Sequence, residues 1–312
     1  MPSSKPPAAR KTPSSPPLLQ PLKGVHVLSL ALNLPGPAAL MRCRQMGASC
    51  VKLEPPPPTG VQAGASGDPM KLYNPTAYDA LHSGVRTTAA DLKTERGQAL
   101  LHRELAKADV LLTSFRPSAL MKLGLGWKAL HKQYPQLSQV AIVGSPGERA
   151  EEPGHDLTYL AENNLVTSLD LPATLYADMG GSLMASEAVL QAVLHQRAKG
   201  KGTYLEVALS VAAGYLALPR SWGLTQPGAA VGGGHAGYRL YACKDGRVAL
   251  AALEPHFAAS LCAAAGVQAS GMKAMFAPAT HVAIEAWLKG RTRKELDALA
   301  VEKDIPLHTL AP

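Results

Sequence analysis

Short apolar runs alternate with longer stretches of helical periodicity along the first half of the chain. Their spacing is typical of βαβ units, in which a helix connects two neighbouring parallel strands. It predicts strands at residues 25–30, 50–54, 87–90, 110–115 and 139–143, and helices at residues 36–46, 94–107 and 118–133. We therefore expect a parallel sheet closed by the strand at 139–143, with a loop over residues 55–67 between its two halves.

The pattern changes after residue 144. Helical stretches at 156–163 and 182–199 precede a candidate strand at 203–208 and an apolar helical run to residue 218. A Gly-rich loop follows, and then two apolar runs separated by Asp245 and Gly246, which predict a hairpin. The remainder of the chain has helical periodicity.

These elements predict an α/β fold with two domains. A large domain with a parallel, Rossmann-like sheet is expected over residues 21–218, and a smaller α+β domain over residues 219–312. Residues 1–20 are rich in Pro and Ser and contain too few apolar side chains to bury, so they are predicted to form a disordered tail.

The length allows two domains of ordinary size or one large domain, either of which can host an enzyme, and the composition predicts an interior built from aliphatic side chains. The chain has 312 residues, of which 46% are hydrophobic and only 5% aromatic, so Ala, Leu and Val must form its core. Its apolar stretches are shorter than the roughly 20 residues that a membrane-spanning helix needs. The four cysteines form no CxxC pair and have no metal-ligand spacing. We expect a reduced, metal-free, cytoplasmic protein without a membrane segment.

The net charge of +8 comes almost entirely from the first 52 residues, because no acidic residue precedes Glu54. The chain lacks an RNA-binding aromatic pattern, a zinc finger and a long basic helix. We therefore expect no nucleic-acid partner. Scattered cations of this kind favour one small polyphosphate ligand instead.

The turn at residues 33–37, with Glu54 about twenty residues further on, has the spacing of a dinucleotide site. Its glycine fingerprint is missing, since only Gly36 is present between two prolines. An NAD-type oxidoreductase is therefore an alternative that the sequence disfavours, and an ordinary turn is the simpler interpretation.

Two further segments carry candidate chemistry. Asp178 stands beside Gly180 and Gly181 at a predicted helix start, where a carboxylate next to backbone amides suits a nucleophile or a base, or simply caps the helix. His155 lies at another helix start, and Glu254 follows an apolar strand. If these two side chains meet they form an oriented base; otherwise they are structural.

Several motifs together resemble one known family. They are PLKGV at 21–25, MGASCVKLEP at 46–55, DLK at 91–93, KADVLL at 107–112, FRP at 115–117, LGLG at 123–126, GHD at 154–156, ADMGG at 177–181, GKG at 200–202 and LEP at 253–255. Their order and spacing are similar to those of the family III CoA-transferases, also called CaiB/BaiF, over roughly residues 21–310.

This resemblance implies a two-domain α/β fold, an acyl-CoA thioester as substrate with no permanently bound cofactor, and an interlocked homodimer. It implies that Asp178 is the family's central carboxylate, which becomes acylated in transferases and acts as a base in α-methylacyl-CoA racemases. In the racemases, His155 and Glu254 would pair on the opposite face of the substrate's α-carbon. The resemblance also places six residues along the CoA groove: Lys52, Ala90, Lys93, Arg116, Lys122 and Leu125.

The presence of both His155 and Glu254 favours racemase chemistry on a 2-methylacyl-CoA, with Asp178 and His155 exchanging the α-proton and the amides of Gly180 and Gly181 binding the enolate oxygen. The alternative is a CoA-transferase that forms an acyl anhydride on Asp178. In that mechanism a glycine loop would cover the intermediate, and its residues are Gly232, Gly233 and Gly234.

A third possibility is a catalytically inactive CoA-binding protein. It is suggested by the short spacing between His155 and Asp178 and by the end of the sequence at Pro312. The end of the sequence at Pro312 also leads us to expect a dimer that is smaller or looser than is usual in the family.

Overall fold

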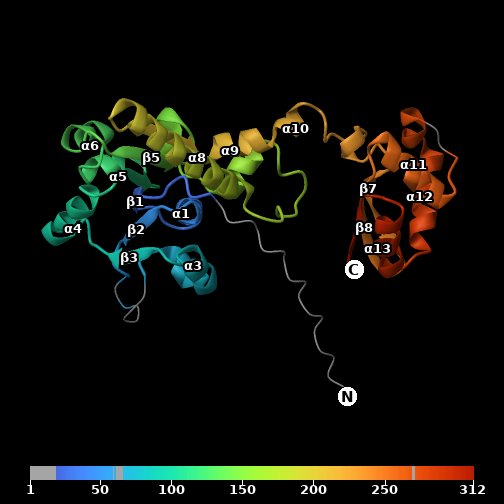
Figure 1. Cartoon of the computed structure of the whole chain (residues 1–312), viewed down its shortest axis with the longest axis horizontal. Coiled ribbons are helices and arrows are strands. Elements are labelled where there is room, and N and C mark those ends of the chain that lie inside the picture. The colour runs from blue at the N-terminus through green and yellow to red at the C-terminus, as the bar shows by residue number, and fades with distance from the viewer. Residues whose placement is uncertain (1–18, 59, 61–65, 269–270) are drawn as a thin grey trace, which may run out of the picture. The chain divides into compact units, whose positions relative to one another are not determined.

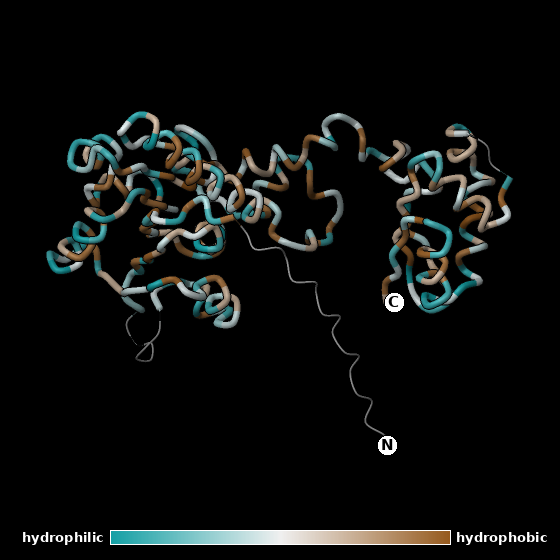
Figure 2. Tube along the Cα trace, in the orientation of Figure 1, coloured by the Kyte–Doolittle hydropathy of each residue, from teal (hydrophilic) through white to brown (hydrophobic). Residues whose placement is uncertain are grey.

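The computed structural model describes residues 19–58, 60, 66–268 and 271–312, so the predicted tail lies almost wholly outside the described residues. The chain forms two compact units, one extending to Leu216 and the other from Ala217 to Pro312 (Figure 1). Hydrophobic and hydrophilic segments alternate along the trace of each unit (Figure 2).

The first unit is built on a six-stranded parallel sheet with the strand order β3-β2-β1-β4-β5-β6. The direction of strand addition therefore reverses between β1 and β4, which lie side by side in its centre. The strands are β1 (His26–Ser29), β2 (Ser49–Glu54), β3 (Arg86–Ala89), β4 (Val110–Thr113), β5 (Ser138–Val143) and β6 (Tyr204–Ala208).

The sheet extends one strand further than we expected. β5 was predicted to close it, but β6 pairs with β5 in parallel and forms the edge. That prediction was wrong because β6 follows β5 only after two intervening helices, and local periodicity does not show which strands pair.

Helices cover both faces of this sheet. Residues Val27 and Leu28 of β1 point to opposite faces, as alternation requires. Val27 packs in a cluster with Leu40 and Val189, and Leu28 packs in a separate cluster with Leu101. The helices are α1 (Pro35–Gln45), α2 (Pro69–Tyr73), α3 (Pro75–Leu81), α4 (Glu95–Leu105), α5 (Pro117–Lys122), α6 (Trp127–Gln133), α7 (Asp156–Glu162), α8 (Tyr176–Lys199) and α9 (Leu209–Leu216), with a 3-10 turn at Gly147–Glu151.

The second unit is a three-stranded antiparallel sheet with helices packed on one face. Val248 and Leu250 of the central strand share a core with Ile284 and Leu288. The unit contains α10 (Leu218–Ser221), β7 (Tyr238–Cys243), β8 (Gly246–Ala251), α11 (Pro255–Ala265), α12 (Pro278–Lys289), α13 (Arg293–Glu302) and β9 (Leu307–Leu310), with 3-10 turns at Ala230–Gly232 and Met272–Phe276. The predicted hairpin is present, whereas β9 corrects the expectation of a wholly helical remainder.

Within the described part of the chain, no helix combines the length and the apolar composition needed to cross a bilayer.

One glycine near the sheet's carboxyl edge is required by a close approach rather than by a turn. Gly97 lies in the first turn of α4, and a Cβ there would come 1.8 Å from the backbone oxygen of Asp91. We predict that Gly97→Ala lowers the free energy of unfolding by about 1–3 kcal/mol in urea melts, although alanine normally favours a helix over glycine by about 1 kcal/mol.

The matched control is Gly290→Ala at the C-cap of α12, where φ is −77° and the nearest atom to the new Cβ, Trp287 O, lies at 3.7 Å. This change should not lower the stability, because alanine adopts this conformation without strain. A Gly97→Ala protein as stable as the control would contradict the close approach.

Candidate active site

A cavity of about 670 Å³ lies at the carboxyl ends of β1, β4 and β5, where the strand order reverses. Ligands of open parallel sheets bind at this position, because the loops after the two central strands diverge to opposite sides. Three residues predicted from the sequence, Arg116, His155 and Asp178, line this one cavity. The structure thus brings together side chains that are up to 62 positions apart.

Asp178 is held at the start of α8 by a neighbouring carboxylate. Its backbone N–H donates to Asp156 Oδ1 at 2.9 Å. Asp156 is buried and is the first residue of α7, so this bond ties the start of α8 to the start of α7. Asp156 has no assigned role in our sequence prediction, although it belongs to the GHD motif.

The electrostatic surroundings make Asp178 an unusually strong base for an aspartate. Burial, reinforced by the negative charge of Asp156 and opposed by His155, raises the pKa of Asp178 to about 6. At neutral pH the carboxylate is therefore ionised, but it holds a proton more tightly than an exposed aspartate does. This is the tuning that general bases of enzymes show.

His155 forms the N-cap of α7, with its backbone N–H donating to the Thr158 hydroxyl at 3.0 Å. This bond fixes its backbone at the rim, and the residue lines the cavity. Glu254 belongs to the second unit, where it is the N-cap of α11. Its pairing with His155 therefore stays a prediction.

Gly180 and Gly181 do not form a loop, because α8 begins at Tyr176 rather than near residue 182. From its fifth residue on, a helix uses each N–H for its own carbonyl bonds, so these two amides are not free to bind an enolate oxygen. The glycines instead permit close packing: a Cβ on Gly181 would lie 2.2 Å from Leu209 Cδ2, at the start of α9. The predicted role of their amides is therefore corrected.

The six predicted CoA-groove residues divide into two groups. Three are exposed: Arg116, at the N-cap of α5, Lys93 and Lys122. The other three are buried, and the first of them, Ala90, directly follows β3. Lys52 and Leu125 differ from the expectation, because both side chains are fully buried. Leu125 contributes to the wall of a separate, mostly apolar cavity of about 500 Å³ beside α5 and α6.

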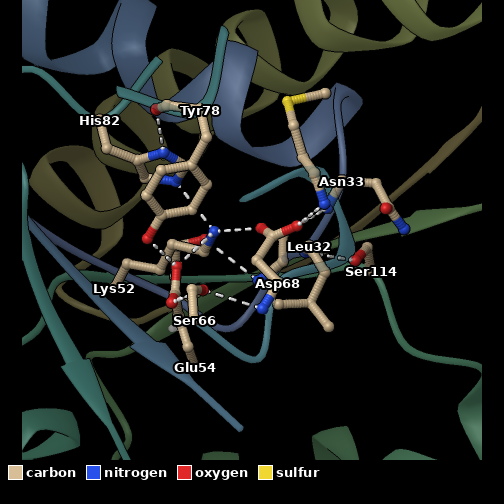
Figure 3. A network of polar contacts seen from close by, with 12 residues as sticks. Leu32, Asn33, Lys52, Glu54, Ser66, Asp68, Tyr78, His82 and Ser114 are labelled. Atoms are coloured by element: carbon tan, nitrogen blue, oxygen red, sulfur yellow. Dashed lines mark hydrogen bonds and ion pairs between the residues drawn. The ribbon is translucent and has the colours of Figure 1, made fainter. Parts of the chain in front are cut away.

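Lys52 lies instead in an internal polar network (Figure 3). Its ammonium pairs with Glu54 and Asp68 and contacts His82, and all four residues are buried. Among the described residues, Glu54, Asp68 and His82 form the one group whose ligand atoms are close enough to hold a metal ion. The lysine ammonium lies among them.

The sequence prediction missed α2 and α3, which lie just after the expected loop. Asp68 is the N-cap of α2, Tyr73 is its last residue, and His82 is the C-cap of α3. Tyr73 lines the candidate cavity. Each helix starts with the same signal, an Asx residue that caps the helix followed by Pro, at Asp68-Pro69 and Asn74-Pro75. That N-cap pattern could have identified both helices.

The predicted glycine loop forms one wall of a separate cavity of about 730 Å³ in the second unit. Gly233 has a left-handed φ of 90°, and a Cβ on Gly232 would lie 1.9 Å from the carbonyl oxygen of Gln226. These glycines are thus required by the folding of the loop itself. Whether they cover a substrate stays a prediction.

A larger cavity, about 940 Å³, lies at the amino ends of the strands of the first unit. Its cations include Arg44, in the last turn of α1, and Lys107, just after α4. Cations at helix C-termini stabilise the helices' own negative ends, so the fold accounts for them. None of the predicted site residues lines this cavity, and we place the candidate site at the carboxyl edge.

The first unit is thus an α/β domain of the class that binds a ligand where the strand order reverses, with a carboxylate and an imidazole lining the cavity there. Comparison with known proteins identifies the family. The chain belongs to CoA-transferase family III, whose model matches residues 22–311. The resemblance drawn from the sequence motifs is confirmed.

Similar proteins include both racemases and transferases. The alpha-methylacyl-CoA racemase of Mus musculus is 28% identical over 276 residues, which cover 83% of this chain and 68% of that protein. The cinnamoyl-CoA:phenyllactate CoA-transferase of Clostridium sporogenes is 36% identical over 139 residues, 43% of this chain. That match spans only 34% of the length of the transferase.

The fold is also shared with solved structures. A hypothetical protein from Mycobacterium tuberculosis superposes with a TM-score of 0.78 at 24% identity, covering 93% of this chain and 84% of that one. This likeness confirms the predicted α/β fold.

The raised pKa of Asp178 yields a stability prediction. The folded protein holds the Asp178 proton more tightly than the unfolded chain does, so ionisation of this group opposes folding above about pH 6 and has no effect below about pH 4. We predict that Asp178→Asn raises the free energy of unfolding by about 1–3 kcal/mol at pH 8 and leaves it unchanged at pH 4. Urea melts at both pH values measure this.

Asp170→Asn, at an exposed loop position, is the control and should change stability little at either pH. An Asp178→Asn variant that is less stable than the parent protein at pH 8 would show that the carboxylate stabilises the fold.

Proposed function

We propose that this chain acts on an acyl-CoA thioester and moves a proton at the α-carbon of the acyl group. The observation that carries the proposal is that Asp178 and His155 line one cavity at the switch point, with Asp178 tuned to a pKa of about 6. Racemisation needs two such groups, a base on one face of the α-carbon and an acid on the other. The match to a racemase over most of this chain supports the same choice.

In the proposed reaction Asp178 removes the α-proton and His155 returns a proton from the opposite face. The negative charge that develops on the thioester oxygen needs a positive environment. The positive end of the α8 dipole, at the first turn that carries Asp178, provides one. Glu254 would orient His155, as the sequence predicts.

The CoA phosphates would face the exposed cations of the large unit. Arg116 lines the cavity itself, Lys122 is exposed at the end of the same helix, α5, and Lys93 is exposed in the turn between β3 and α4. A guanidinium or ammonium at such a position favours phosphate without fixing the acyl group.

CoA transfer is the second candidate, supported by the glycine loop and by the transferases among the relatives. There the Asp178 carboxylate attacks the thioester carbonyl, CoA leaves as a thiolate, and an acyl anhydride forms on the enzyme. Transfer uses Asp178 without requiring His155, and this difference separates the two mechanisms.

The two mechanisms predict different losses of activity for two variants, Asp178→Asn and His155→Ala, assayed with 2-methylacyl-CoA in heavy water. For racemisation, Asp178→Asn and His155→Ala should each lose interconversion and retain α-deuterium exchange from one stereoisomer only, a different one in each variant. The parent rate should fall as the pH is lowered through about 6, because Asp178 becomes protonated.

For transfer, Asp178→Asn should abolish exchange of labelled CoA, whereas His155→Ala should only weaken it. Hydroxylamine should then cleave the anhydride, and the hydroxamate that forms on Asp178 or on the released acyl group should be detected by mass spectrometry. A folded Asp178→Asn protein that binds CoA and turns over acyl-CoA at the parent rate would refute both mechanisms. A parent protein that binds CoA but catalyses neither reaction would support the inactive CoA-binding alternative.

Arg116 provides a test of the ligand. We predict that Arg116→Ala weakens CoA binding about tenfold by calorimetry and reduces the salt dependence of binding, because one phosphate contact is lost. Lys199→Ala is the control, since Lys199 ends α8, 21 residues beyond Asp178, about 30 Å along the helix. Equal affinities for the two variants would place the CoA phosphates elsewhere.

A further inference from the structure

The Lys52 ammonium lies at the centre of three acceptors (Figure 3). Its Nζ is 2.9 Å from Glu54 Oε1, 2.5 Å from Asp68 Oδ2 and 2.8 Å from His82 Nε2. An ammonium has three N–H donors and no acceptor, so these contacts use its full capacity. The four residues are between 0% and 7% exposed, which places the whole cluster in the interior.

The acceptors are held as metal ligands are held. His82 Nδ1 lies 2.7 Å from the carbonyl oxygen of Tyr78, so Nδ1 carries the proton and Nε2 presents its lone pair to the ammonium. Burial, together with the Lys52 charge, lowers the pKa of His82 and keeps the ring neutral. Glu54 accepts hydrogen bonds from the hydroxyls of Tyr78, at 2.6 Å, and Ser66. Outer partners that fix a tautomer and a carboxylate in this way are typical of metal centres.

The donor set also suits a metal. The ligand atoms of Glu54, Asp68 and His82 lie within 4.8 Å of one another. One imidazole and two carboxylates are a set that zinc accepts, with water as a fourth ligand. In this chain the cation at the centre is an ammonium group supplied by β2.

Asp68 connects this centre to the candidate active site. Its Oδ1 accepts the backbone N–H groups of Asn33, at 3.1 Å, and Met70, at 3.0 Å. Asn33 lies in the turn between β1 and α1 with a left-handed φ of 62°, a conformation that asparagine adopts more readily than most residues. Met70 lies in α2, which ends at Tyr73, and both Asn33 and Tyr73 line the cavity.

We propose that Lys52 is the resident cation of a metal-like centre and that this centre, acting through Asp68, positions the wall of the candidate active site formed by the β1–α1 turn and α2. Lys52 is thus a positioning residue, since its ammonium is enclosed and acts through another side chain. The positioning of the β1–α1 turn and α2 does not depend on the reaction. Only the importance of this positioning for catalysis rests on the proposed function.

The experiment replaces the cation and then supplies another. In Lys52→Met with a chelator present, the melting temperature should fall by about 10 °C, because two buried carboxylates lose their counter-charge. Amide hydrogen exchange at Asn33 and Met70 should become at least about tenfold faster as the Asp68 bonds weaken. Zinc chloride should reverse most of both changes, because the metal occupies the vacated position.

Lys71→Met is the matched control. Lys71 lies 4.8 Å from the centroid of the same Tyr78 ring but pairs with the exposed Asp79. Its removal should leave exchange at Asn33 and Met70 unchanged and should confer no response to zinc. The parent protein should not respond to zinc either.

Asp68→Ala keeps the proposal testable if Lys52→Met does not fold, because Lys52 retains Glu54 and His82. Exchange at Asn33 and Met70 should again rise, but zinc should have no effect because one ligand is missing and the ammonium stays in place. Unchanged exchange in Asp68→Ala, or a Lys52→Met protein that does not respond to zinc, would overturn the proposal.

These measurements use no acyl-CoA, so they separate this inference from the proposed function. A zinc-rescued Lys52→Met protein whose parent form fails to turn over acyl-CoA would retain the inference and reject the function. An active parent protein whose two variants leave the Asn33 and Met70 amides unaffected would do the reverse.

Discussion

The fully buried charge of Lys52 is the constraint on which this end of the molecule depends. An ammonium in the interior is tolerated only when carboxylates and other acceptors surround it, and loss of one partner of such a buried pair costs about 3–5 kcal/mol. β2 supplies only one carboxylate to the same face, Glu54, two residues further on. The other two acceptors, Asp68 and His82, come from the N-cap of α2 and the C-cap of α3, so the charge of Lys52 ties both helices to β2.

Asp178 illustrates the opposite relation between charge and stability. Its carboxylate is partly buried and lies near the carboxylate of Asp156, so the folded state bears an unfavourable interaction at neutral pH. The charge of Lys52 is neutralised by two carboxylates, whereas the pKa of Asp178 stays raised because its own surroundings do not neutralise it. A buried group that is poorly neutralised by its own protein is a typical feature of sites that react with a ligand.

The sequence was sufficient for the elements whose signal is local and strong. The strands of the large sheet are apolar runs between helical segments, and their approximate positions and the class of fold follow from that pattern. The short helices α2 and α3, of five and seven residues, have too few turns to show a periodicity. β9 has only four residues, and its pairing with β8 is a contact between distant segments that local pattern does not show.

The residues of the candidate site likewise fall into those that could be predicted from the sequence and those that could not. His155, Asp178 and Arg116 belong to motifs that could be recognised in sequence, and the structure places all three around one cavity. The glycines at 180 and 181 suggested a loop because glycine disfavours helices, but contact with α9 makes small residues necessary inside α8. The burial of Lys52 could not be predicted, because a lysine and a glutamate two residues apart in a strand give the same pattern on a surface as in a core.

The order of strands has a consequence for how the protein is made. β1 leaves the ribosome before the five other strands of its sheet, yet it lies in the interior of the finished sheet and pairs with β2 on one side and β4 on the other. Until residues 110–113 have been synthesised, one edge of this apolar strand has no partner. Nascent chains shorter than this expose a hydrophobic sheet edge of the kind that chaperones recognise, and the pocket between the β1 and β4 loops does not yet exist.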